Sequence, residues 1–196
     1  MQRHLIFLLL LSSNFCAAQG QSSFNFKLSE AAISLTRQHI TYDPAYYNIP
    51  YPNGDVPAGK GVCTDVVIRA YRKLGIDLQK EVHEDMKANF SKYPNNWGRT
   101  STDRNIDHRR VPNLMVFFKR HGSVKPISRK AQDYSPGDIV CWNLSGGLTH
   151  IGIVVNRVSI DRKRYLIVHN IGGGQVLEDC LFKYKVIGHY SYRPHL

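Results

Sequence analysis

The chain has 196 residues, of which 42% are hydrophobic and 21% are charged, and it carries a formal net charge of +11. This composition is sufficient for one folded domain with a hydrophobic core. The positive charge predicts attraction to anionic cell-wall polymers or membrane surfaces, although a solvated basic surface without a specific partner has the same charge. Nucleic acid is not an expected partner, because the chain contains no recognition motif for it and begins with an export signal.

The N-terminus has the features of a secretory signal peptide. A basic start is followed by an apolar run over residues 5–11 and then by two alanines, a pattern too short for a membrane span. We expect residues 1–18 to be a signal peptide and residues 19–196 to form one exported domain, periplasmic or extracellular. Lipidation at Cys16 is disfavoured because the bulky Phe15 precedes it. No other segment is apolar enough to cross a bilayer, so we expect no stable membrane insertion. We also expect the protein to be a monomer.

Helical patterns occupy the first half of the mature chain. Ser29 is a candidate N-cap for a first helix, and Gly75 fits the left-handed position after a second. The segment before the second helix is rich in Tyr, Pro, Gly and Asn, which predicts an ordered loop. The expected helices span residues 29–38, 63–74, 78–90 and 112–121, with loops at 41–61 and 91–111.

Strand patterns dominate the second half of the chain. The sequence 136–138, Pro-Gly-Asp, predicts a turn, and the two glycines at 146–147 predict a hairpin-like connection. Helices followed by an antiparallel meander predict an α+β fold in a single domain. The expected strands span residues 139–142, 149–156, 164–170, 176–182 and 185–193.

Cys63 has the position of a nucleophile. It begins the expected helix 63–74, where the helix dipole and unpaired backbone N–H groups favour the thiolate. A cysteine in such a position has its pKa lowered from about 8.5 toward roughly 3.5–7.5. Because His150 and His169 lie on expected strands downstream, the chain offers a nucleophile, a base and a residue to orient that base.

Three cysteines follow the expected signal peptide, namely Cys63, Cys141 and Cys180. An odd number leaves at least one thiol unpaired in an exported protein. Cys141 lies in an apolar strand and is typical of a small buried hydrophobic residue, but a disulfide with Cys180 is an open alternative. Cys63 is the thiol that we expect to stay free.

Three sequence blocks follow one another along the chain. The first block, residues 63–78, is a cysteine that begins a helix ending in Gly-Ile-x-Leu. The second joins Gly-Asp-Ile-Val at 137–140 to His-Ile-Gly-Ile at 150–153. The third is a hydrophobic strand that ends in His169. In this order and spacing the chain resembles the NlpC-type bacterial cell-wall cysteine peptidases, a papain-like α+β family. It resembles more closely a family in that neighbourhood, domain of unknown function 1287.

The resemblance implies a papain-like (NlpC-like) fold, with N-terminal helices packed on an antiparallel β-sheet, and a cysteine hydrolase without cofactor. The implied partners are peptidoglycan stem peptides or muropeptides, cleaved by an endopeptidase or an N-acetylmuramoyl-L-alanine amidase. The chain departs from the NlpC pattern at Val62 and Thr64, where that family usually has Asp and Ser, and its segment 79–130 is longer. A catalytically silent cell-wall-binding module with the same fold is the alternative.

The resemblance also implies roles for individual residues. Cys63 would attack the scissile carbonyl, His150 would exchange protons with it, and His169 would hold one tautomer of His150. Asn170 is the alternative third member, but the motif favours His169, and adjacent strand residues face opposite sides. Tyr51 corresponds to a family tyrosine whose hydroxyl lies in the site, and the Cys63 backbone N–H is a natural oxyanion donor.

Charged residues complete the expected site. Asp65 is expected to cap the helix or to pair with an arginine such as Arg69 or Arg109, and to point away from the thiol, because a nearby carboxylate raises a thiol pKa. His108 and Arg109 belong to a basic segment, 95–111, that either forms one wall of a substrate cleft or is a solvated loop.

A metal site is not expected from the spacing of the ligand residues. The candidates lack the compact His-x-x-His or Cys-x-x-Cys spacing of common sites, and a metal would leave Cys63 unexplained. The residues considered are Asp138, His150, His169 and His189.

Overall fold

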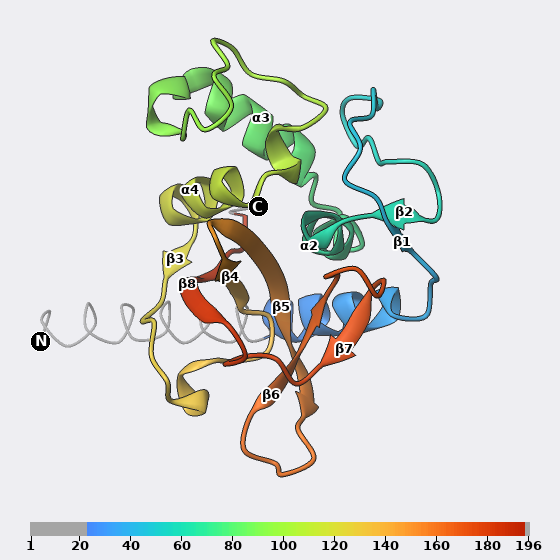
Figure 1. The fold of residues 1–196 in the computed structure, drawn as a ribbon, viewed down its shortest axis with the longest axis vertical. Helices are drawn as coiled ribbons and strands as arrows, with labels where there is room; N and C mark the ends of the chain where they lie inside the picture. Colours follow the sequence, from blue (N-terminus) through green and yellow to red (C-terminus); the bar gives the residue numbers. More distant parts are fainter. Residues whose placement is uncertain (1–22, 195–196) are drawn as a thin grey trace, which may run out of the picture.

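The structure is a computed structural model that describes residues 23–194. The expected signal peptide at 1–18 and the lipidation alternative at Cys16 lie outside these residues. The described chain folds into helices and one main antiparallel sheet (Figure 1). This arrangement confirms the α+β prediction, while the papain-like assignment stays a prediction.

The helices lie close to their expected positions. A helix over residues 23–35 begins the described chain, before the expected cap at Ser29. Gly75 has φ +80°, and the N–H of Ile76 donates to the Tyr71 carbonyl, so α2 ends as the sequence predicted. The further helices are α2 (Cys63–Arg72), α3 (Leu78–Ala88) and α4 (Val111–His121), with 3₁₀ turns η1 (Phe90–Lys92), η2 (Asp107–Arg109) and η3 (Ala131–Asp133).

The main sheet has the strand order β3-β8-β4-β5-β6-β7, and every neighbouring pair in it is antiparallel. Its strands are β3 (Ser123–Val124), β4 (Ile139–Ser145), β5 (Leu148–Val158), β6 (Tyr165–His169), β7 (Val176–Glu178) and β8 (Lys185–Ser191). A separate parallel pair, β1 (Thr41–Tyr42) and β2 (Lys60–Gly61), brackets the loop before α2.

One strand departs from the expected meander. Strands β4 to β7 follow one another across the sheet, but β8 returns to pair with β4. In that position Tyr190 of β8 packs 6.1 Å from the ring of Phe118 in α4. Burial of this side chain against α4 explains why β8 does not extend the sheet beyond β7.

The sheet is covered on both faces, because residues on its strands alternate between two buried clusters. Ile151 and Cys141 face the helices, where they pack with Val67 of α2. Trp142 lies in the cluster on the other face, and its indole N–H donates to the Leu181 carbonyl. Figure 1 shows α2, α3 and α4 gathered beside one end of this sheet, with β1 and β2 next to α2.

The buried cysteines are also divided between the clusters on the two faces of the sheet. Cys141 lies in the helix-side cluster, whereas Cys180 lies in the cluster on the opposite face. Both are free, as is Cys63, so the alternative of a Cys141–Cys180 disulfide is not realised. Within residues 23–194, no helix has the length and apolar character needed to span a bilayer.

Candidate active site

Cys63 is the first residue of α2, and its side chain is only 7% exposed. β2 ends two residues earlier, and the Asn170 side chain donates a 3.2 Å hydrogen bond to the Gly61 carbonyl. This bond ties the end of β6 to the chain that leads into the helix. Asn170 therefore fixes the position of the Cys63 segment.

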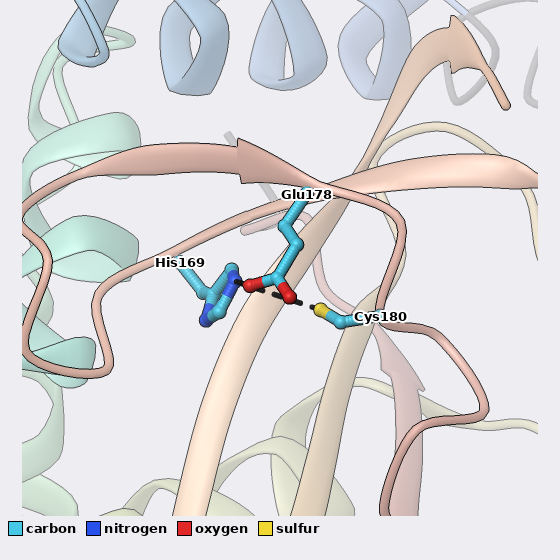
Figure 2. A group of neighbouring side chains, drawn as sticks. All are labelled: His169, Glu178 and Cys180. Carbon is cyan, nitrogen blue, oxygen red and sulfur yellow. Dashed lines mark hydrogen bonds and ion pairs between the residues drawn. The ribbon is translucent and has the colours of Figure 1, made fainter. Parts of the chain in front are cut away.

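Two histidines and a glutamate form a hydrogen-bonded chain across β5, β6 and β7. His150 Nε2 lies 2.9 Å from His169 Nδ1, and His169 Nε2 lies 3.0 Å from Glu178 Oε2. The β6–β7 register places His169 opposite Val176, so Glu178 is its diagonal neighbour on the same face of the sheet. Figure 2 shows the Glu178 carboxylate directed at the His169 ring. Thus His169, and not Asn170, is the residue bonded to His150.

The carboxylate determines which nitrogens carry protons. A hydrogen bond from Lys183 lowers the pKa of Glu178, so Glu178 is ionised and can only accept. His169 must therefore donate from Nε2. Burial lowers the pKa of His169 and keeps it neutral, so its Nδ1 is an acceptor for the Nε2–H of His150. A neutral His150 carries its one proton on Nε2, so its Nδ1 is available to accept a proton.

Gly152 allows the two histidine strands to approach each other. A Cβ at this position would lie 2.8 Å from Ile167 Cγ2 and 3.1 Å from the Cβ of His169. Both distances are closer than ordinary carbon contacts. The glycine two residues after His150 is thus needed to bring β6, and with it His169, against β5.

The Cys63 thiol is buried in a way that the sequence did not reveal. Burial raises the pKa of Cys63 to about 12, although the Ile151 N–H bonds to the sulfur and opposes this shift. The charge of Asp65 raises it further. The expected lowering of this pKa is therefore wrong, because loss of solvent outweighs the N–H groups at the helix start.

His150 shows the complementary shift. Burial lowers the pKa of His150 to about 3, so the resting site holds a neutral thiol and a neutral imidazole. Among the hydrogen bonds of residues 23–194, none joins the Cys63 thiol to His150; the N–H of the next residue, Ile151, contacts the sulfur instead. Catalytic hydrogen bonds of this kind are often long without substrate and shorten when substrate binds.

Asp65 and Arg109 are occupied with each other. Arg109 donates from Nε and Nη2 to the two carboxylate oxygens of Asp65 at 3.0 and 3.1 Å. Asp65 also accepts the Val62 N–H at 2.7 Å, which caps α2, and Arg109 donates to the carbonyl of Ala45. Asp65 thus both caps the helix and pairs with Arg109, as the sequence predicted. Because both side chains are buried and paired, their geometry favours positioning of the loop beside Cys63 over contact with substrate.

Tyr51 and His108 were also expected in the site. Tyr51 packs edge-on against His83 with ring centres 5.3 Å apart. Burial raises its pKa, with a further contribution from Glu84. His108 is buried in η2, and burial lowers its pKa to about 3. Among the hydrogen bonds and ring contacts of residues 23–194, none joins Tyr51 or His108 to Cys63.

Two residues near the site were missed from the sequence. Burial raises the pKa of Tyr42 in β1, and Tyr42 lies close enough to Cys63 that a thiolate there would raise this pKa further. Tyr42 is therefore a further tyrosine near the thiol. The position of Glu178 beside His169 follows from the way β6 and β7 pair. The sequence does not reveal this pairing, because the three glycines at 172–174 do not fix the register of the two strands.

A solved structure described as an N-acetylmuramoyl-L-alanine amidase from Bacteroides uniformis matches 85% of this chain and 96% of its own, with a TM-score of 0.46 and 11% identity. That likeness is too low to support an argument about fold or activity.

Sequence comparison is decisive about the family. A protein of Escherichia coli (strain K12), called uncharacterized protein YijF, is 48% identical over 174 residues, which cover 89% of this chain and 84% of that protein. The profile of the family described as domain of unknown function (DUF1287) matches residues 29–192. The chain therefore belongs to the DUF1287 family.

Proposed function

We propose that this protein is an exported cysteine hydrolase with a papain-like arrangement, which cleaves peptide or amide bonds in peptidoglycan stem peptides or muropeptides. One observation carries the proposal. The hydrogen-bonded chain from Glu178 through His169 ends at His150, and the N–H of the next residue contacts the Cys63 sulfur. This proximity supports Cys63 as the nucleophile, His150 as the base and His169 as the orienting group.

The neutral state of the site suggests general-base catalysis. Nδ1 of His150 would accept the Cys63 proton as the sulfur attacks the carbonyl carbon, so that thiolate forms only during attack. His150 would then donate that proton to the leaving amine. Water would hydrolyse the resulting thioester with His150 again acting as base. His169 and Glu178 would hold His150 in the tautomer whose Nδ1 can accept.

The oxyanion formed during attack needs donors close to the sulfur. The Cys63 backbone N–H at the start of α2 has the right position for one donor. The Tyr42 hydroxyl, which shares its electrostatic environment with Cys63, is the second donor that we propose. Tyr42 takes the role that the sequence suggested for Tyr51.

The substrate class rests on the three sequence blocks and on the charge of the chain. A net charge of +11 favours association with anionic wall polymers, and stem peptides carry several carboxylates. The N-terminal pattern supports export to the place where these polymers are found.

The silent wall-binding module is a second candidate, because one observation favours it. With a Cys63 pKa of about 12 and a His150 pKa of about 3, the resting site lacks the thiolate–imidazolium pair of many cysteine hydrolases. A module that retained the fold without turnover would show the same protonation states.

Mass spectrometry of muropeptides separates the two candidates. The mature protein should generate fragments that Cys63→Ala does not, while Cys141→Ala, which removes a buried thiol facing the same core, should retain activity. Shortened stems would identify an endopeptidase, and loss of lactyl-linked stems an amidase. Fragments produced equally by Cys63→Ala would contradict the mechanism. Wall binding without fragments would favour the module.

A further inference from the structure

Three side chains able to bind a metal converge where β7 ends. One ligand atom each of His169, Glu178 and Cys180 lies within 4.8 Å of the other two (Figure 2). The Cys180 Sγ is 3.5 Å from His169 Nε2, and Glu178 Oε2 is 3.0 Å from the same nitrogen. The sequence did not indicate this group of ligands. His169 lies nine residues before Glu178, and Glu178 and Cys180 form a Glu-x-Cys at the end of β7.

The distances suit a tetrahedral cation with little movement. Bonds of about 2.0–2.1 Å to nitrogen and about 2.3 Å to sulfur, at a tetrahedral angle, place those two ligand atoms about 3.5 Å apart. Equal bonds to nitrogen and a carboxylate oxygen require roughly 3.3 Å, slightly more than the 3.0 Å seen here. A cation inserted among the three atoms would need the carboxylate to move by only a few tenths of an ångström.

The surroundings leave one side of the cluster open. His169 and Cys180 are buried, whereas the Glu178 side chain is 33% exposed. Lys183 binds the other carboxylate oxygen, Oε1, at 2.8 Å, so it opposes a cation by its charge but does not occupy Oε2. Asp179 adds a negative charge beside Cys180. The partly exposed carboxylate gives an incoming cation access to the cluster from solvent, and a tetrahedral cation would take water as its fourth ligand.

We propose that His169, Glu178 and Cys180 form a binding site for a divalent cation of the zinc class. Imidazole, carboxylate and thiolate together match the ligand preferences of Zn²⁺ and not those of Mg²⁺ or Ca²⁺. Binding requires loss of the Cys180 proton.

If the proposed hydrolase mechanism holds, the cation also switches it off. A metal on Nε2 of neutral His169 places the ring proton on Nδ1, which then donates to Nε2 of His150. His150 in turn carries its proton on Nδ1, the nitrogen that must accept from Cys63. Each imidazole still carries one proton, which has moved from Nε2 to Nδ1. The single proton released on binding comes from Cys180.

Cobalt(II) titration tests the site without any assay of activity. The mature Cys63→Ala protein is used, so that the thiol beside His150 cannot bind. It should show a thiolate-to-cobalt charge-transfer band that persists with Cys141→Ser added and disappears with Cys180→Ser. Zinc affinity measured by calorimetry should fall at least about tenfold with Cys180→Ser. Absence of the band, or its survival in Cys180→Ser, overturns the proposal.

Two further measurements complete the test. Glu178→Gln, at a partly exposed position, should retain the cobalt band but bind zinc about tenfold more weakly; unchanged affinity would overturn the three-ligand site. In protein with Cys63 intact, zinc should slow muropeptide cleavage relative to each variant's own metal-free rate, and Cys180→Ser should remove that inhibition. Binding without inhibition would overturn the switch, and absence of cleavage in every sample would count against the hydrolase alone.

Discussion

The buried ion pair beside Cys63 gives a quantitative prediction about stability. The side chains of Arg109 and Asp65 are 2% and 4% exposed and share two hydrogen bonds. Asp65→Asn keeps the shape and one acceptor, but leaves the Arg109 charge buried without its counterion. Removing one partner of a buried pair destabilises proteins by about 3–5 kcal/mol. We expect a loss near the lower limit, about 3 kcal/mol, because Arg109 keeps backbone carbonyl acceptors.

A second pair in the same chain provides the control. Arg164 binds both oxygens of Asp179 with the same two-bond geometry, but these side chains are 30% and 34% exposed. Exposed pairs contribute about 0.2–1 kcal/mol, so Asp179→Asn should destabilise the protein by less than about 1 kcal/mol. The comparison isolates burial, since the chemistry of the two pairs is the same.

Urea unfolding followed by circular dichroism measures the difference. With a denaturant slope of about 1–3 kcal/mol per molar, a loss of about 3 kcal/mol lowers the midpoint by roughly 1–3 M. Adding Arg109→Met to Asp65→Asn should restore part of the stability, because it removes the orphaned charge. Equal midpoints for Asp65→Asn and Asp179→Asn would refute the reasoning from burial.

The remaining predictions concern the histidines and their supports. The hydrolysis rate should not decline near pH 6.5, where an ordinary imidazole gains a proton, but only toward pH 3, because burial lowers the pKa of His150 to about 3. Gly152→Ala should displace β6 and reduce kcat/KM by about 10²-fold. Glu178→Gln should lower kcat by between about tenfold and 10⁴-fold with KM little changed, since either tautomer of His169 becomes possible. Burial lowers the pKa of His108 to about 3. The free energy of unfolding should therefore fall by up to about 1.4 kcal/mol per pH unit between pH 6.5 and about 3 because of this residue. Urea titration at several pH values measures this slope.

The sign of the last effect follows from proton uptake. Below pH 6.5 the unfolded chain binds a proton at His108 that the folded chain refuses until the pH nears 3, so acid favours unfolding. His108→Leu should reduce the slope, and an unchanged slope would exclude His108 as its source. For the other variants, a normal rate in Gly152→Ala or a rate decline centred near pH 6.5 in folded protein would contradict the site geometry.

Local patterns allowed much of the fold to be predicted. The start of α2 at Cys63 and its end before Gly75 follow from helix periodicity and from a glycine at a positive φ. The strands carrying His150 and His169 follow from short apolar runs, and antiparallel pairing then brings the two rings together. These features depend on residues close in sequence or on adjacent strands, which is why sequence alone indicated them.

Features that depend on distant packing were not predicted. The return of β8 to β4 reflects contacts with α4, some seventy residues away in sequence. Burial of Cys63 depends on surrounding segments that no local pattern specifies, and this burial reverses the expected direction of its pKa shift. The sequence could therefore indicate candidates for the nucleophile and the base but not their protonation states, since those depend on solvent exclusion in the folded protein.

Glu178 connects the proposed chemistry with the proposed metal site. Its ionised oxygen Oε2 holds the proton on Nε2 of His169, and the hydrogen bond between His169 and His150 then leaves Nδ1 of His150 as the proton acceptor. The same oxygen and the same nitrogen are the ligands that a zinc-class cation would take. A proton and a cation therefore compete for one position, with opposite effects on the base.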